Sequence, residues 1–498
     1  HTIEDLGVPS IVLMEHAATG VVDALRERFP DARRVLVLAG PGNNGGDGIS
    51  AARHLADGGL QVELLLLTDP DRLDGDPALE WRLAERFDLP RRVVADDDLV
   101  AVDEALASAP DVVVDAMLGT GLDRPLGGRL AEVAARIGDA GPPVVAVDVP
   151  TGLSGSGCGV PGPVLTADLT VTFASLKRCH VLPPACLHCG EVAVVEIGIP
   201  QRALVDGADL WWVEPSDVAL MLPPRPPDGH KGRFGHLAIL AGAIGRGGAA
   251  AMAGRAAVVA GAGLVTMAVP EPTVGVVDGA CLEAMTLGLP ADGDGAVAVI
   301  DALLHQLDRF TAVAVGPGLG TGDGARAALE TLLDRWSGAL VLDADAVNLL
   351  AGRLERLADR GGPTILTPHP GELGRLLDRP TDDVVADRLG AARDAARRAR
   401  AVVVAKSFRT LIVEPGGQAW VNPTGDAHLG SGGSGDVLTG LIAGLVAQGL
   451  DSERAAIVGC WLHGRAGELG AARWPAAVPA AELSQWIADA WRELEEPV

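Results

Sequence analysis

Short apolar runs alternate with segments of helical periodicity along both halves of this 498-residue chain. This alternation is typical of parallel α/β sheets, in which a crossover helix follows each buried strand. A chain of this length is too long to fold around one ordinary hydrophobic core, and it suits two domains of roughly 200 and 270 residues. In the first half we expect six strands, at residues 34–38, 61–67, 111–115, 143–147, 168–173 and 191–197.

These six strands predict a Rossmann-like three-layer sandwich for an N-terminal domain at residues 1–205. The segment at residues 222–228, Leu-Pro-Pro-Arg-Pro-Pro-Asp, is stiff and suits neither a helix nor a central strand, so we expect the linker near residues 201–227. A second strand and helix series begins at His236. The expected C-terminal domain is therefore also α/β and covers residues 222–498.

The amino-acid composition excludes some classes of binding partner and indicates where the protein resides. A net charge of −26 argues against nucleic acid and anionic membranes, since both require a basic face. We find no apolar run of about 18 residues that could span a bilayer, and the first residues lack the features of a signal peptide, so we expect a cytoplasmic protein.

Six irregularly spaced cysteines predict reduced thiols. The cluster at residues 179–189 lacks the paired two-residue Cys spacing of strong zinc motifs, so the sequence gives little support for a zinc site there and assigns the cluster no role.

Lysine is scarce. Only Lys177, Lys231 and Lys406 occur among 40 basic residues. Arginine readily replaces a solvated lysine but not a compact ammonium at a crowded site, so each of these lysines has a raised chance of a specific role. Compositional accident is the alternative for any one of them.

A glycine-rich segment at residues 40–48, Gly-Pro-Gly-Asn-Asn-Gly-Gly-Asp-Gly, follows the first expected strand and precedes a helix-like run that starts at Ile49. This is the phosphate-binding position of such folds, where glycines allow positive φ and helix-terminal N–H groups attract anions. The segment lacks the Gly-Lys-Ser/Thr of a P-loop. A plain strand-to-helix connection is the alternative, but the adjacent Asn-Asn and Asp favour function.

Two further strand ends carry Asp115 and Asp148. Because the carboxyl ends of parallel strands face one crevice, we expect both carboxylates to converge with the glycine-rich segment. Such groups bind hard cations or move protons, although an Asp at a strand end is often only a helix cap or a turn former.

These segments, together with residues 115–122, 147–152 and 170–173 and Lys177, resemble the NAD(P)HX epimerase family over most of residues 5–200. That family interconverts the R and S forms of hydrated NADH and NADPH and carries a potassium ion. The resemblance implies that K⁺ is bound by Asn44, Asp115 and Thr151 and that Asp148 is the catalytic proton shuttle. It implies that the hydrate is bound by Asn43, Asn44, Gly45, Gly46, Asp47, Gly119, Thr120, Gly121, Leu122, Asp123, Arg124, Pro125 and Asp148.

The second half contains a stronger motif at residues 430–440, Gly-Ser-Gly-Gly-Ser-Gly-Asp-Val-Leu-Thr-Gly, which opens a helix. The N–H groups at this helix end form an anion hole, and Asp436 lies beside it on the first turn. Phosphoryl transfer to a hydroxyl needs a base at such a place, because the acceptor proton must leave as charge builds on the phosphate.

With residues 316–320, 343–348, 367–372 and 406–410, this motif resembles the ribokinase-like NAD(P)HX dehydratase family over about residues 225–490. There, a nucleotide phosphorylates the hydrate hydroxyl and phosphate is then eliminated. The resemblance implies that Asp436 is catalytic and that the hydrate is bound by Ala249, Gly318, His369 and Asp436. It implies that the nucleotide, ADP or ATP with Mg²⁺, is bound by Lys406, Ser407, Phe408, Arg409, Thr410 and Gly435.

The resemblance thus predicts a bifunctional epimerase and dehydratase that acts on NADHX and NADPHX, and we expect a homo-oligomer. Two other classes stay open. A small-molecule kinase of the ribokinase or hydroxyethylthiazole type would share the helix end at Asp436 but leave the N-terminal motif without a role. The second open class is a non-catalytic nucleotide-binding or scaffolding protein, since fold alone does not prove activity.

Overall fold

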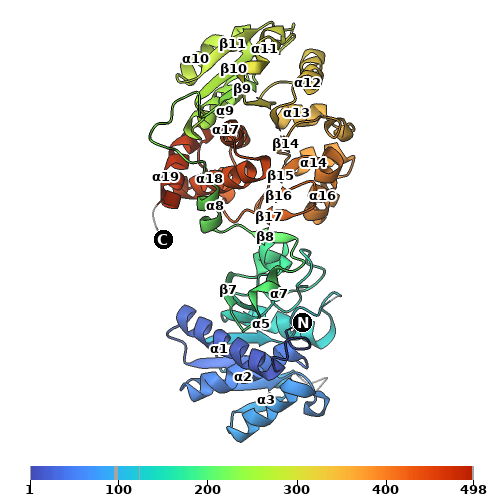
Figure 1. Cartoon of the computed structure of the whole chain (residues 1–498). Helices are drawn as coiled ribbons and strands as arrows, with labels where there is room; N and C mark the ends of the chain where they lie inside the picture. The colour runs from blue at the N-terminus through green and yellow to red at the C-terminus, as the bar shows by residue number, and fades with distance from the viewer. Residues whose placement is uncertain (1, 95–98, 123, 496–498) are drawn as a thin grey trace. The chain divides into compact units, whose positions relative to one another are not determined.

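The computed structural model describes residues 2–94, 99–122 and 124–495. The chain divides into two compact units, His1–Ala208 and Asp209–Val498, each with its own sheet (Figure 1). Among the described residues, no helix combines the length and the hydropathy that crossing a membrane requires.

The N-terminal unit is built on a seven-stranded sheet in which every neighbouring pair is parallel. The spatial order of its strands is β3 (Arg91–Val93), β2 (Gln61–Leu66), β1 (Arg34–Ala39), β4 (Val112–Ala116), β5 (Val144–Val147), β6 (Leu169–Phe173) and β7 (Glu191–Val195). This is the doubly wound Rossmann order, so the expected fold is confirmed. All six expected strands are present, while β3 was not expected because Arg-Arg-Val is too short and polar to read as a strand.

Helices cover both faces of this sheet. Alternate strand residues point to opposite faces, so Val35 and Val37 pack under one helical layer and Leu36 and Leu38 under the other. The first layer holds α1 (Ser10–Arg28), α2 (Asn43–Asp57) and α3 (Gly75–Arg86); the second holds α4 (Val100–Ala107) and α5 (Gly128–Ala140). The remaining short helices are η1 (Pro70–Arg72), α6 (Arg178–Val181), η2 (Ala185–His188) and α7 (Gln201–Val205).

Helix α2 begins at Asn43 and not at Ile49, so the Asn-Asn-Gly-Gly-Asp-Gly motif forms its first turns. None of the glycines in this motif has a positive φ. A Cβ on Gly45 would overlap the Gly40 carbonyl oxygen, and one on Gly48 would overlap the Ala116 side chain. The glycines therefore serve close packing of α2 against β1 and β4, and the expectation that they supply left-handed backbone is wrong.

The C-terminal unit contains a ten-stranded mixed sheet. Its order is β11 (Met285–Leu289), β10 (Leu264–Pro270), β9 (His236–Leu240), β12 (Ala312–Val315), β13 (Ala339–Leu342), β14 (Thr364–Leu366), β15 (Val402–Ala405), β16 (Leu411–Val413), β17 (Ala419–Val421) and β8 (Leu210–Trp212). Only β16 pairs antiparallel with its two neighbours. The α/β architecture expected for this half is confirmed.

The expected linker at residues 201–227 contains regular structure. Strand β8 pairs in parallel with β17, and α8 (Pro215–Met221) follows it. The C-terminal unit therefore starts at Asp209 and not at residue 222. The proline-rich residues 222–228 form neither helix nor strand, as their stiffness predicts.

One face of the second sheet packs against α9 (Gly247–Val259), α17 (Ser434–Ala447), α18 (Ser452–Ala471), α19 (Leu483–Glu495) and α8. Helices α12 (Asp323–Arg335), α13 (Ala344–Leu349), α14 (Pro370–Leu377) and α16 (Arg388–Ala399) lie together to the other side (Figure 1). The remaining helices are η3 (Glu271–Thr273), α10 (Val274–Ala280), α11 (Asp301–Leu304), η4 (Leu307–Arg309), η5 (Leu354–Leu357), α15 (Thr381–Ala386), η6 (Ala427–Leu429) and η7 (Ala480–Glu482).

Candidate active sites

In the N-terminal unit, a cavity of about 790 Å³ opens at the carboxyl ends of β1 and β4. The strand order reverses between these two strands, which is where ligands bind in doubly wound sheets. Ten of the described residues predicted to bind the hydrate line it: Asn43, Asn44, Asp47, Gly119, Thr120, Gly121, Leu122, Arg124, Pro125 and Asp148. The structure thus brings the three separate sequence motifs together at one cavity.

Two of the predicted residues that the structure describes, Gly45 and Gly46, are not among those that line the cavity. Gly45 and Gly46 are buried inside the packing of α2, where a Cβ on Gly46 would lie 2.6 Å from the Met14 side chain. At both positions the close packing requires glycine. Asp123 lies outside the described residues.

Asp148 is fixed at the cavity by Lys177. The Lys177 ammonium donates to Asp148 Oδ1 at 2.6 Å and to Thr172 Oγ1 at 2.7 Å, and Thr172 donates to the same carboxylate oxygen at 2.9 Å. Asp148 has a φ of 63°, a left-handed conformation that is unusual for a residue other than glycine. A strained backbone and two donors therefore hold this carboxylate in one orientation. The sequence motif included Lys177, but only the structure gives it a partner.

A second carboxylate, Asp47, lines the same cavity from α2. Burial raises the pKa of Asp47 well above its ordinary value, and the nearby charges of Asp148 and Glu80 raise it further. Asp47 therefore holds a proton more readily than an ordinary aspartate, while Asp148 is paired with the Lys177 ammonium.

Asp115 and Thr151 meet beneath the cavity. Asp115 is fully buried and accepts hydrogen bonds from the Thr151 amide at 2.8 Å, the Thr151 hydroxyl at 2.7 Å and the Met117 amide at 3.2 Å. Burial raises its pKa to about 6, because no cationic side chain among the described residues offsets the loss of water. Asn44, the third predicted ligand, packs beside Gly119, and its side-chain nitrogen is buried without a hydrogen-bond partner.

The cysteine cluster packs as part of the fold. Cys179 and Cys189 are buried in a small apolar core, and the Cys189 thiol donates to the Cys179 carbonyl oxygen at 3.6 Å. Across the described residues, no group of three or more His, Cys, Asp and Glu side chains could hold a metal ion.

In the C-terminal unit, the predicted residues again follow strand ends. The strand order reverses between β9 and β12, and Gly318 follows β12, His369 follows β14 and Lys406 follows β15. Ala249, on the first turn of α9, lies against Gly318, where an added Cβ would be 3.1 Å from the Ala249 methyl. Gly318 has a φ of 61°, so both its conformation and this close approach require glycine.

Asp436 lies on the first turn of α17, as the sequence predicts. Gly433, with a φ of 96°, is the N-cap, and the first-turn N–H groups that follow have no acceptors within the helix. Burial raises the pKa of Asp436 to about 6, and Asp343 raises it while Lys406 opposes the shift. Asp436 is therefore a stronger base than an ordinary aspartate and sits beside an anion-binding helix end. The whole helix from Val437 onward is buried, so it has no solvent-exposed face.

Lys406 follows strand β15, and its ammonium lies near the N-terminal end of α17. Its ammonium donates to Asp343 Oδ1 at 2.7 Å and lies 3.9 Å from Glu372 Oε2. An added Cβ on Gly435 would lie 3.4 Å from the Lys406 nitrogen, so the ammonium adjoins the glycine-rich turn. Burial lowers the pKa of Lys406, but Asp343 and Glu372 outweigh this effect and raise it overall, so the ammonium stays charged.

His369 caps helix α14. Its Nδ1 accepts from the Gly371 amide at 3.0 Å, and Glu372 accepts from the His369 amide at 2.8 Å. Burial and the charge of Lys406 lower the pKa of His369, so the ring is neutral near pH 7. The ring is half exposed and still presents its other nitrogen.

Residues 407–410 form the turn between β15 and β16. Ser407 and Thr410 are joined across it, with the Thr410 hydroxyl donating to the Ser407 carbonyl at 2.8 Å. Arg388 donates to the carbonyls of Phe408 and Arg409, both at 3.0 Å, and so fixes the turn from α16. The Phe408 side chain is exposed.

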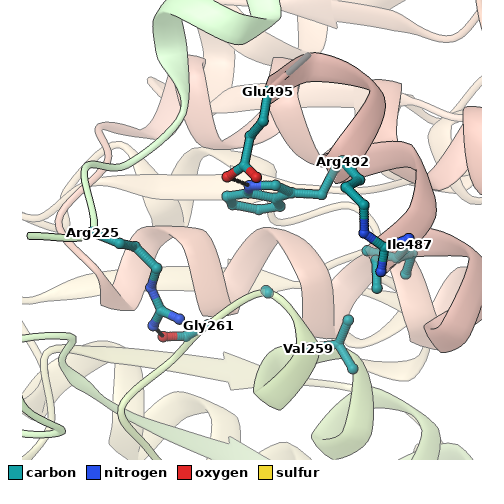
Figure 2. Close-up of a pocket in the computed structure, with 9 residues that line it drawn as sticks. Arg225, Val259, Gly261, Ile487, Arg492 and Glu495 are labelled. Carbon is teal, nitrogen blue, oxygen red and sulfur yellow. Dashed lines mark hydrogen bonds between the residues drawn. The ribbon is translucent and has the colours of Figure 1, made fainter. Parts of the chain in front are cut away.

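A smaller pocket of about 230 Å³ lies elsewhere in this unit, at the end of α9 and along α19 (Figure 2). Arg225 donates to the Gly261 carbonyl at 2.6 Å, and the Trp491 indole donates to Glu495 at 3.2 Å. None of the residues predicted to bind hydrate or nucleotide lines this pocket.

Comparison with known proteins gives two family matches. The model for NAD(P)H-hydrate dehydratase matches residues 237–489, and the model for the YjeF-related protein N-terminus matches residues 10–179. The bifunctional NAD(P)H-hydrate repair enzyme of Moorella thermoacetica is 39% identical over 499 residues, which cover 99% of this chain and 94% of that protein. Its counterpart from Thermofilum pendens is 35% identical, with coverage of 99% and 94%.

Solved structures match the C-terminal half. The ADP/ATP-dependent NAD(P)H-hydrate dehydratase of Bacillus subtilis, crystallised with ATP and Mg²⁺, has a TM-score of 0.52 and 32% identity, covering 58% of this chain and all of that one. A ribokinase-like superfamily protein of Enterococcus faecalis has a TM-score of 0.51 and 26% identity, covering 58% and 98%.

Proposed function

The chain belongs to the family of bifunctional NAD(P)H-hydrate repair enzymes, and we propose that its two units perform consecutive reactions. The N-terminal unit interconverts the R and S forms of NADHX and NADPHX. The C-terminal unit then uses ADP or ATP to dehydrate the S form to the reduced coenzyme. The observation that supports the proposal is the position of the two predicted catalytic carboxylates. Asp148 lines the cavity of the first unit, and Asp436 lies on the first turn of α17, close enough to Asp343 and Lys406 for their charges to shift its pKa.

In the epimerase site, the hydrate carbon must lose its hydroxyl group and regain one on the opposite face. The leaving oxygen needs a proton, and the incoming water must give one up, so a carboxylate can serve in both directions. Lys177 and Thr172 fix Asp148 Oδ1 at the cavity and leave its other oxygen for the substrate. Arg124 and the glycine-rich loop at residues 119–121 line the same cavity and can hold the anionic part of the dinucleotide.

We propose that Asn44, Asp115 and Thr151 hold a potassium ion. Asp115 supports this assignment because it is a fully buried carboxylate without a cationic partner among the described residues. A buried charge of this kind is unfavourable unless it is paired. Oxygen donors suit a hard cation, and the side-chain amide of Asn44 provides another when its oxygen is turned toward Asp115.

In the dehydratase site, the hydrate hydroxyl oxygen attacks the terminal phosphorus of ADP or ATP, and its proton passes to Asp436. The bond from that phosphorus to the bridging oxygen breaks at the same time, and its electrons leave with AMP or ADP. The first-turn N–H groups of α17 and the Lys406 ammonium stabilise the phosphate charge. The phosphate then leaves with the electrons of its bond to carbon, and loss of a neighbouring proton restores the double bond. The Mg²⁺ that accompanies a nucleotide would be held mainly by the phosphate oxygens, with one or two carboxylates from the protein.

The test is to incubate the purified protein with a mixture of R and S hydrates, with and without ADP or ATP, and to follow recovery of reduced-nicotinamide absorbance. Full recovery with nucleotide requires both reactions, because the S form alone accounts for only part of the mixture. Recovery limited to the S form would contradict the epimerase assignment. A stable phosphorylated product without coenzyme recovery would instead support the small-molecule kinase, which the near-complete match to bifunctional relatives disfavours.

A further inference from the structure

Asp343 lies at the centre of the C-terminal strand ends, directly after β13, and it has no role in the reaction as described so far. Its side chain is 1% exposed. Oδ1 accepts from the Lys406 ammonium at 2.7 Å and from the Thr367 hydroxyl at 2.7 Å, and Oδ2 accepts from the Thr439 hydroxyl at 2.7 Å. One carboxylate therefore joins β13 to the ends of β14 and β15 and to helix α17.

The surroundings of Asp343 leave it little freedom to move. Gly316, with a φ of 132°, packs so closely against the Asp343 carbonyl oxygen that an added Cβ would overlap it. Burial raises the pKa of Asp343, but Lys406 and the two hydroxyl groups outweigh that effect and lower it overall. The group is thus a fixed, ionised carboxylate in a protein interior.

A buried ion pair is a poor device for stability, because well-packed apolar residues of similar volume often stabilise a fold equally well or better. Its location suggests a different purpose. Lys406 adjoins Gly435 on the glycine-rich turn, and Asp436 raises the pKa of Lys406 electrostatically. Thr439 lies one turn beyond Asp436 on the same helix.

We infer that Asp343 is a positioning residue of the dehydratase centre, which holds the Lys406 ammonium and, through Thr439, the first turns of α17 in one fixed arrangement. This inference rests on the proposed function of the C-terminal unit. The lysine and the proposed base belong to separate elements, and Asp343 contacts the lysine and the helix at once. Its charge also keeps Lys406 protonated in a buried place.

Thr439 offers the sharpest test, because valine has nearly the same shape as threonine without the hydroxyl group. Thr439→Val should lower the nucleotide-dependent kcat/KM by about 10-fold or more, the range expected when one hydrogen bond to a charged group is lost. Thr439→Ser retains the hydroxyl and should stay within about threefold of the unmodified enzyme. Asp343→Asn should have a larger effect than Thr439→Val, with a rise in the KM for nucleotide because Lys406 loses its anchor.

Epimerase activity of each full-length variant, measured without nucleotide, reports whether the rest of the chain is intact. Thermal unfolding separates a structural role from a positioning one. A Thr439→Val enzyme that melts earlier but keeps its kcat/KM at 25 °C would overturn the inference, as would equal losses in Thr439→Val and Thr439→Ser. If the unmodified enzyme showed no nucleotide-dependent dehydration, the proposed function would fail instead, a result that the variants could not produce.

Discussion

Replacing Asp436 with asparagine tests the dehydratase chemistry most directly. Asparagine has nearly the same size but cannot accept the hydroxyl proton. The variant should therefore lose most of the general-base contribution, about 10²- to 10⁴-fold in kcat. The hydrate and the nucleotide should still bind, because the first-turn N–H groups of α17 and Lys406 remain in place.

The raised pKa of Asp436 predicts how the reaction rate and the stability of the protein change with pH. Because the pKa rises from 3.8 to about 6 on folding, the base is protonated below pH 6, and the rate of the unmodified enzyme should fall as pH drops through that value. The raised pKa also means that the ionised group opposes folding, by up to about 3 kcal/mol above pH 6. This cost disappears below the unfolded-state pKa near 4. Asp436→Asn should therefore melt at the same temperature as the unmodified enzyme or a few degrees higher at pH 8.

The assay combines coenzyme absorbance recovery with separation of the R and S hydrates and with thermal unfolding. Asp345→Asn is a control for the loss of a nearby charge. Asp345 lies on α13, accepts from the Gly320 amide at 2.8 Å and from Arg246 at 3.4 Å, and its charge raises the pKa of Asp436. This variant should reduce kcat far less than Asp436→Asn. Full dehydratase activity in Asp436→Asn would remove this residue from the mechanism, and loss of both activities would contradict two independent sites.

Three further predictions concern the lysines and the cation site. Asp115→Ala should abolish both potassium dependence and epimerase activity; equal activity of the unmodified enzyme with and without potassium would refute the ion site. Lys177→Met should lower the epimerase kcat by about 10-fold or more, because Asp148 loses its charged donor at 2.6 Å. An unchanged rate of exchange between the R and S forms would show that Lys177 does not orient Asp148. Lys406→Arg should raise the KM for nucleotide while changing the melting temperature little, because a planar guanidinium does not fit the site of a compact ammonium 2.7 Å from Asp343. An unchanged KM would mean that the scarcity of lysine is an accident of composition.

Local patterns in the sequence were sufficient for several features. The alternation of apolar runs with helical periodicity predicted the parallel sheets, because strand burial on both faces and a crossover helix follow from that pattern. The motifs predicted Asp148 at a strand end and Asp436 on the first turn of a helix, and the structure has both there. Both depend on a short stretch of chain whose own geometry sets where the side chain lies.

Other features depended on neighbours that are distant in the chain. The glycines of the Asn-Asn-Gly-Gly-Asp-Gly motif were read as left-handed, but the structure shows that they admit the backbone of Gly40 and the side chain of Ala116 against α2. Strand β8 looked like linker because a three-residue strand shows no periodicity, and only its pairing with β17 defines it. Local sequence does not encode such contacts.

The hydrogen-bond partners of Lys177 and Lys406 also depended on the tertiary structure. Rarity in the sequence singled out Lys177 and Lys406 without saying what either one does. Asp148 lies 29 residues before Lys177, and Asp343 lies 63 residues before Lys406. The sequence by itself determined which residue types lie at the ends of the strands. Only the tertiary structure decided which of them meet, because hydrogen bonds of 2.6 to 2.7 Å between distant segments depend on strand order and register.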